Sequence, residues 1–134
     1  MRCLWEWGGT EMNILIVEDC QILQMINREL MNEWGYHFDM ASNGKEAIEL
    51  VQKNNGKYDL CLMDIDMPTM NGIEATKIIR KISKYFPIMA LTANASYKKA
   101  CFEAGMDSFV EKPCLPDDLF RKINELSVKS KNRK

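Results

Sequence analysis

Acidic residues follow two apolar segments that lie far apart in the chain. Glu18 and Asp19 come directly after the apolar run at 13–17, and Asp64 comes directly after a second run at 60–63. Carboxylates that lie close together repel one another, and Mg2+, which takes about six oxygen ligands, relieves that repulsion. A carboxylate can also act as a nucleophile and carry a phosphoryl group. The three residues are therefore candidate metal ligands, and Asp64 is also a candidate nucleophile.

Two more polar residues follow apolar segments in the second half of the chain. Thr92 follows the run at 88–91, and Lys112 comes shortly after the run at 108–110. A hydroxyl group and an ammonium group can hold phosphoryl oxygens, and phosphoryl transfer depends mainly on such positioning and electrostatics. Taken singly, Lys112 has the ordinary explanation of a surface lysine. These residues gain meaning only if the fold brings them to the same place.

Short apolar runs alternate with amphipathic segments along the chain from Met12 onward. The alternation predicts a doubly wound α/β fold: a five-stranded parallel sheet in the order 2-1-3-4-5, covered by helices on both faces as a three-layer sandwich. The predicted strands are 13–17, 37–41, 60–63, 88–91 and 108–110. The first helix is predicted from a stripe made of Ile22, Leu23, Ile26, Leu30 and Trp34.

Ligands of such sheets bind at the carboxyl ends of the strands, at the point where the strand order reverses. Here that point lies between the first and third strands, which end at Glu18-Asp19 and at Asp64. Thr92 and Lys112 follow the fourth and fifth strands and fall on the same edge of the sheet. The topology therefore predicts one site that contains all five residues.

Five segments of the chain resemble the receiver domain of two-component response regulators. They are ILIVED at 14–19, LMDIDMP at 62–68, NG at 71–72, ALTA at 90–93 and FVEKP at 109–113. The resemblance implies a CheY-like fold and a phosphorelay function. A histidine kinase or a histidine phosphotransfer protein would donate a phosphoryl group to Asp64, and a conformational change would signal to a downstream protein target. Such a domain catalyses only its own phosphorylation and dephosphorylation, so we expect no other enzymatic activity.

The resemblance also assigns the metal ligands. It implies that Mg2+ is bound by the side chains of Glu18, Asp19 and Asp64 and by the backbone carbonyl group of Asp66. Members of the family often have an uncharged residue where this chain has Asp66. We expect the Asp66 side chain to point into water; the alternative is that it alters metal affinity or the lifetime of the phosphoryl group.

The remaining roles concern the phosphoryl group and the switch. The resemblance implies that Thr92 and Lys112 hold the phosphoryl group and that the Lys112–Pro113 peptide bond is cis. It further implies that Phe109 is the switch aromatic, which turns inward when Thr92 moves toward the phosphoryl group. Phe109 has no hydroxyl group, so a switch that needs a tyrosine hydrogen bond is excluded.

Three other functions fit the sequence less well. Residues 64–67 begin the D-x-D-x-(T/V) signature of haloacid dehalogenase phosphohydrolases, but Pro68 stands where that signature requires Thr or Val. A nucleotide-binding module would need a Gly-rich loop after the first strand, and this chain has Glu-Asp-Cys there. A receiver that serves only as a binding platform would not need Asp64, Thr92 and Lys112 together.

Composition narrows the class of protein further. The net charge of −1 gives no reason to expect direct nucleic-acid binding, and no apolar run approaches the roughly 20 residues of a membrane span. The five cysteines are odd in number and form no C-x-x-C pair, which argues against a disulfide or zinc framework. Reduced cysteines fit a cytoplasmic location.

The domain boundaries follow from the extent of the resemblance. Residues 12–127 are predicted to form the receiver domain, and residues 128–134 a basic disordered tail. We interpret residues 1–11 as a non-native extension translated from a ribosome-binding region, with a native arm as the alternative. The sequence leaves open whether the domain stands alone or belongs to a longer hybrid kinase, and whether phosphorylation produces a dimer.

Overall fold

The computed structural model of this chain describes residues 12–67 and 70–132, and the side chains of 127–132 are not among the described groups. Five strands form one parallel sheet in the order β2-β1-β3-β4-β5, which confirms the predicted doubly wound topology. In chain order, the elements are β1 (Asn13–Val17), α1 (Gln21–Trp34), β2 (His37–Ala41), α2 (Gly44–Lys53), β3 (Leu60–Asp64), α3 (Gly72–Ile82), β4 (Ile88–Thr92), the 3-10 turn η2 (Ala95–Tyr97), α4 (Lys98–Ala104), β5 (Ser108–Glu111) and α5 (Pro116–Asn132).

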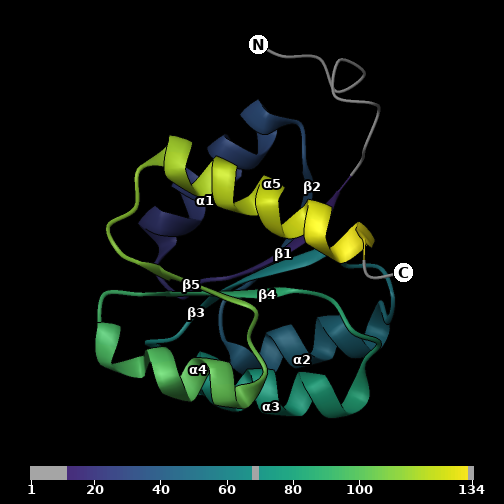
Figure 1. Ribbon diagram of the computed structural model, residues 1–134. Coiled ribbons are helices and arrows are strands. Elements are labelled where there is room, and N and C mark those ends of the chain that lie inside the picture. The colour runs from purple at the N-terminus through teal and green to yellow at the C-terminus, as the bar shows by residue number, and fades with distance from the viewer. Residues whose placement is uncertain (1–11, 68–69, 133–134) are drawn as a thin grey trace.

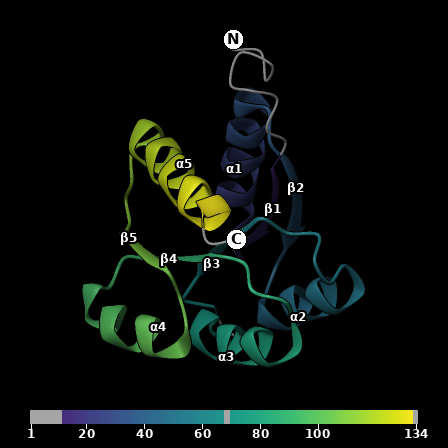
Figure 2. The same cartoon turned by 45° about the vertical axis from the view of Figure 1, so that its right-hand side comes forward.

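The sheet lies between two layers of helices. Helices α1 and α5 cover one face, and α2, α3 and α4 cover the other (Figures 1 and 2). Successive residues of β1 face opposite layers: Leu15 packs in the core beneath α2 to α4, whereas Ile14 and Ile16 pack in the core beneath α1 and α5. Burial on both faces explains why the central strands are continuous apolar runs.

Helix α1 is packed differently from the sequence prediction. Met31 is fully buried near its carboxyl end, and Trp34 packs against the same core. Ile22 and Ile26, which were expected in the core-facing stripe, are 68% and 47% exposed. Helical spacing identifies an apolar face, but it does not reveal whether another element covers that face along its whole length.

Three strands reach one residue further than predicted. β3, β4 and β5 include Asp64, Thr92 and Glu111 as their last residues. Asp64 is aligned with Leu91, and Thr92 with Glu111, in the ladders between neighbouring strands. The candidate site residues Asp64 and Thr92 therefore belong to the sheet itself and not to the loops that follow it.

The carboxyl-terminal helix is longer than the sequence indicated. α5 continues to Asn132, so the backbone of residues 128–132 is helical where a disordered tail was predicted. A polar, basic composition alone does not prevent a helix from continuing when no helix-breaking residue follows. Residues 1–11, 68–69 and 133–134 lie outside the described part of the chain, and the domain boundaries stay predictions. Over the described residues, no helix is long and apolar enough to cross a membrane.

Candidate functional site

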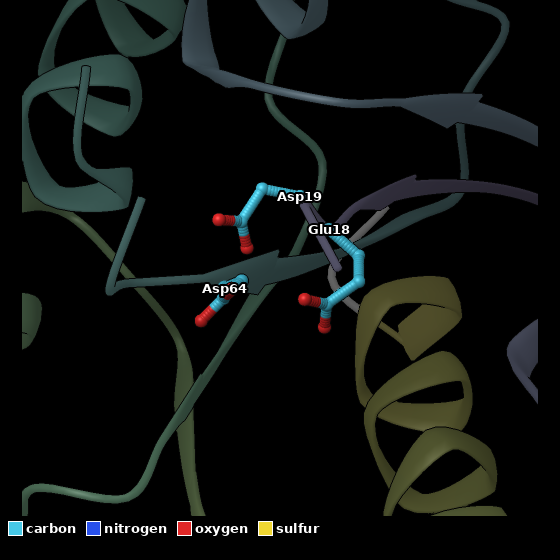
Figure 3. Close-up of side chains that lie close together, drawn as sticks. All are labelled: Glu18, Asp19 and Asp64. Atoms are coloured by element: carbon cyan, nitrogen blue, oxygen red, sulfur yellow. The ribbon is translucent and has the colours of Figure 1, made fainter. Parts of the chain in front are cut away.

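Three carboxylates converge at the carboxyl ends of β1 and β3. Oxygen atoms of Glu18, Asp19 and Asp64 all lie within 4.8 Å of one another, as the strand order predicted (Figure 3). Glu18 and Asp64 are buried, with 2% and 3% of their surface exposed, whereas Asp19 is open to solvent. The cluster is therefore buried on the side of Glu18 and Asp64 and open to solvent on the side of Asp19.

One cation, Lys112, reaches into this cluster. Its Nζ lies 3.4 Å from Glu18 Oε1 and 3.4 Å from Asp64 Oδ1. Burial and the neighbouring Glu18 carboxylate raise the pKa of Asp64 to about 7, against the opposing effect of Lys112. Burial lowers the pKa of Lys112, but the Asp64 and Glu18 carboxylates outweigh it and raise that pKa overall. The site therefore holds more negative charge than its one lysine balances.

The donor set fits a hard divalent cation. Mg2+ binds carboxylate and carbonyl oxygens and keeps several waters, which requires an open side such as the one at Asp19. Burial and the neighbouring Glu18 carboxylate raise the pKa of Asp64, and a divalent cation beside it would favour the charged form. Glu18, Asp19 and Asp64 are thus the residues that would hold the ion.

The backbone around Asp64 is positioned by the start of α3. The amide of Asp66 donates to Asp64 Oδ1 at 3.2 Å. Asn71 caps α3, because its side chain accepts a hydrogen bond from the Glu74 amide at 2.9 Å. A side chain at Gly72 would collide with the Asp64 carbonyl oxygen, so only glycine allows α3 to start this close to β3. This close approach explains the Asn71-Gly72 pair.

The Glu18 backbone is held by contacts that the sequence did not reveal. The Glu18 amide donates to the Ala41 carbonyl at 3.0 Å, and the side-chain amide of Gln24 donates to the Glu18 carbonyl at 2.6 Å. The Cys20 amide donates to Glu18 Oε2 at 3.2 Å. Gln24 lies one turn into α1 and carries no sequence signal beyond that position.

Thr92 does not contact Asp64 through a hydrogen bond in this structure. The fully buried Thr92 donates its hydroxyl proton to Asp66 Oδ2 at 2.9 Å, and Thr92 Oγ1 accepts from the Asn94 amide at 3.1 Å. The expectation that Asp66 points only into water is therefore wrong: the residue is exposed, but its carboxylate binds Thr92. The sequence could not show this, because the contact depends on the side-chain directions of Thr92 on β4 and of Asp66 in the loop after β3.

The remaining candidates lie on β5 and just after it. Phe109 is half-buried and packs against the core beneath α2 to α4. The Lys112 amide donates to the Thr92 carbonyl at 2.8 Å, and the Lys112–Pro113 peptide bond is cis, as the resemblance implied. The four cysteines in the described residues are free, and none belongs to the acidic cluster.

Comparisons with known proteins agree on one family. The family model of the response regulator receiver domain matches residues 14–124. The chain is 40% identical to two-component response regulator 24 of Arabidopsis thaliana, over 88% of this chain and 86% of that protein. It is also 42% identical to hybrid signal transduction histidine kinase B of Dictyostelium discoideum, over 79% of this chain but 6% of that much longer protein.

Solved structures are similar over almost the whole chain. The receiver domain of a Pseudomonas aeruginosa sensor histidine kinase, with a magnesium ion coordinated in its active site cleft, is 30% identical with a TM-score of 0.79, covering 88% of this chain and 98% of that one. The receiver domain of Saccharomyces cerevisiae Ssk1, in complex with the histidine phosphotransfer protein Ypd1, is 30% identical with a TM-score of 0.80, covering 88% and 90%.

Proposed function

Because this chain belongs to the response regulator receiver domain family, we propose that Asp64 is its phosphoacceptor and that Mg2+ is its cofactor. The observation that carries the proposal is the convergence of Glu18, Asp19 and Asp64 within 4.8 Å, with Lys112 beside them. The magnesium-bound relative, which is 30% identical, supports the same metal here.

Each side chain of the site has a task in phosphoryl transfer. A carboxylate oxygen of Asp64 attacks the phosphorus atom of a phosphohistidine, the new P–O bond forms, and the P–N bond breaks with its electron pair returning to the imidazole. Lys112 lies within reach of an oxygen atom on Asp64 and can stabilise the added negative charge. Glu18, Asp19 and Asp64 would hold a Mg2+ ion, which would neutralise charge on the phosphoryl oxygens.

Asp64 must be unprotonated to attack. Burial and the neighbouring Glu18 carboxylate raise its pKa to about 7, which favours the protonated form of Asp64. A divalent cation at the three carboxylates favours the charged form, because an opposite charge lowers the pKa of a carboxylic acid. Metal binding and nucleophile activation are therefore linked at this site.

The phosphodonor would be a histidine kinase or a histidine phosphotransfer protein, as in the yeast complex of a related receiver. The exposed apolar start of α1 supports this partner. Ile22 and Met25 are 68% and 65% exposed, and they lie in the first turns of α1, shortly after the acidic pair in the chain. Leu115 is 70% exposed and lies just after Lys112. A partner that covers these side chains would bring its histidine to the open side of the site.

The other properties follow from the same assignment. The chain would catalyse only its own phosphorylation and dephosphorylation, act in the cytoplasm, and signal to a downstream protein through Thr92 and Phe109. Direct binding to nucleic acid and insertion into a membrane are not part of the proposal. The assignment of Asp64 does not depend on whether phosphorylation produces a dimer or on whether the domain belongs to a longer hybrid kinase.

Phosphorylation with a small-molecule donor tests the proposal. Acetyl phosphate with Mg2+ should add one phosphoryl group that is labile in base, and peptide mass spectrometry should place it on Asp64. Asp64→Asn should abolish incorporation, whereas Glu103→Gln, at an exposed position of α4, should leave it unchanged. A phosphoryl group on any other residue would overturn the assignment.

A further inference from the structure

The hydroxyl group of Thr92 has one proton, and in this structure that proton is donated in a hydrogen bond. Thr92 Oγ1 donates to Asp66 Oδ2 at 2.9 Å and accepts from the Asn94 amide at 3.1 Å. Thr92 is 0% exposed, so water does not compete for the group. A threonine hydroxyl donates one hydrogen bond at a time. A bond to Asp66 and a bond to a phosphoryl oxygen on Asp64 therefore exclude each other.

Asp66 is hydrogen-bonded to both Asp64 and Thr92. Its amide donates to Asp64 Oδ1 at 3.2 Å, while its side chain accepts from Thr92. The acceptor is a carboxylate, and a hydrogen bond to an ionised group is stronger than one between neutral groups. The Thr92 hydroxyl is thus held by a strong hydrogen-bond acceptor in the loop that follows β3, two residues after Asp64.

We infer that Asp66 is a positioning residue that retains the Thr92 hydroxyl group in the unphosphorylated state and releases it when Asp64 is phosphorylated. The inference rests on the proposed function, because it takes the phosphoryl group on Asp64 as the competing acceptor. Breaking the bond to Asp66 is a cost of switching. Asp66 therefore reduces the share of phosphorylated molecules in the switched conformation.

A second explanation has to be separated from this one. The Asp66 carboxylate could oppose phosphorylation by charge repulsion alone, without acting through Thr92. Asp66→Asn removes the charge but keeps a side-chain oxygen that accepts a hydrogen bond, whereas Asp66→Ala removes both. Repulsion predicts the same effect for the two variants; retention of the hydroxyl group predicts a larger effect for Asp66→Ala.

The experiment measures the switched population of the full chain, phosphorylated by acetyl phosphate with Mg2+, from the NMR signals of the Phe109 ring. Asp66→Ala should raise the ratio of switched to unswitched molecules by about three- to tenfold, because a charge-assisted bond at an exposed carboxylate is lost. Asp66→Asn should raise the ratio less. Glu111→Gln, beside Thr92 in the sheet register and exposed, should leave it unchanged.

Variants of Thr92 show whether the effect passes through its hydroxyl group. In a Thr92→Val background, which lacks the hydroxyl, Asp66→Ala should change the ratio no further. In a Thr92→Ser background, which keeps the hydroxyl, the effect of Asp66→Ala should return. An equal effect of Asp66→Ala in the valine and serine backgrounds would overturn the inference.

Phosphoryl incorporation is measured by mass spectrometry in the same samples, so that two failures can be told apart. If Asp64 carries the phosphoryl group and Asp66→Ala leaves the Phe109 ratio unchanged, the inference is wrong and the proposed function stands. If Asp64 of the parent protein takes no phosphoryl group, the proposed function is wrong and the inference falls with it.

Discussion

The charged residues at the two ends of the sheet are paired in different ways. At the amino ends of β4 and β5, Asp107 accepts hydrogen bonds from Arg80 Nη2 at 2.8 Å, from the Tyr85 hydroxyl at 2.5 Å and from the Ile88 amide at 2.9 Å. Arg80 also donates, at 2.9 and 2.6 Å, to the carbonyl groups of Gly105 and Phe86. One carboxylate meets one guanidinium group here, and the bonds are short.

At the carboxyl ends of β1 and β3, the charges are not matched. Of the three carboxylates, Lys112 contacts those of Glu18 and Asp64, and both contacts are 3.4 Å long. Charge-assisted hydrogen bonds are usually about 2.7–2.9 Å long. The Arg80–Asp107 group is complete without a ligand and joins α3 to the sheet. At the acidic site the negative charges outnumber the positive charge of Lys112, and the divalent cation proposed above would balance them.

The largest expected effect on stability comes from breaking the Arg80–Asp107 ion pair. Arg80→Met should lower the free energy of unfolding by about 2–4 kcal/mol, because a mostly buried Asp107 carboxylate loses its counter-charge. Urea unfolding measures this change. The matched control is Arg121→Met, since Arg121 forms an exposed pair with Asp118 at 2.8 Å and should contribute less than about 0.5 kcal/mol. Equal losses in the two variants would show that the Arg80 pair is not special.

Removing a negative charge from the acidic site should have the opposite effect and raise the free energy of unfolding. Without Mg2+, the raised pKa of Asp64 means that the folded state binds a proton more tightly than the unfolded state between pH 3.8 and about 7. The free energy of unfolding should therefore fall as the pH rises through that window. Asp64→Asn should remove this slope and raise the free energy at pH 8 by about 1–3 kcal/mol.

Denaturant titrations at several pH values, in the presence of a chelator, measure the effect of Asp64→Asn. Glu103→Gln, at an exposed carboxylate outside the site, should keep the pH slope of the parent protein. A metal-free Asp64→Asn protein that is less stable than its parent at pH 8 would contradict the view that this end of the sheet carries excess negative charge.

The smallest expected effect concerns the affinity of the acidic site for Mg2+. Mg2+ should raise the melting temperature of the parent protein by mass action. Asp19→Asn keeps the shape of the side chain but removes a charge, and it should weaken Mg2+ binding by about tenfold. Calorimetric titration measures the affinity, with Glu103→Gln as the exposed control. The assignment of Asp19 as a ligand fails if the variant and its parent bind Mg2+ equally well.

Contacts that follow from the strand order could be predicted from the sequence. Burial on both faces makes the central strands apolar, so the first polar residue after each run marks a strand end, as at Glu18 and Asp64. The reversal of strand order then places those ends together. The predicted closeness of the three carboxylates is confirmed, while their roles in binding and transfer stay predictions.

The sequence could not predict which apolar faces of the helices are covered by other elements or where individual side chains point. The same apolar stripe on α1 contains the exposed Ile22 and the packed Trp34, and only the placement of neighbouring elements distinguishes them. The helical backbone of 128–132 continues α5, although its composition indicated disorder.

The sequence by itself determined the fold and the chemical types at one edge of the sheet, because hydrophobic periodicity and strand order are properties of the chain. Only the tertiary structure decided which of these groups are paired. Lys112 lies equally far from Glu18 and Asp64, and Thr92 donates to Asp66. A hydrogen bond depends on distances of a few tenths of an ångström and on rotamers, which packing from several elements sets together.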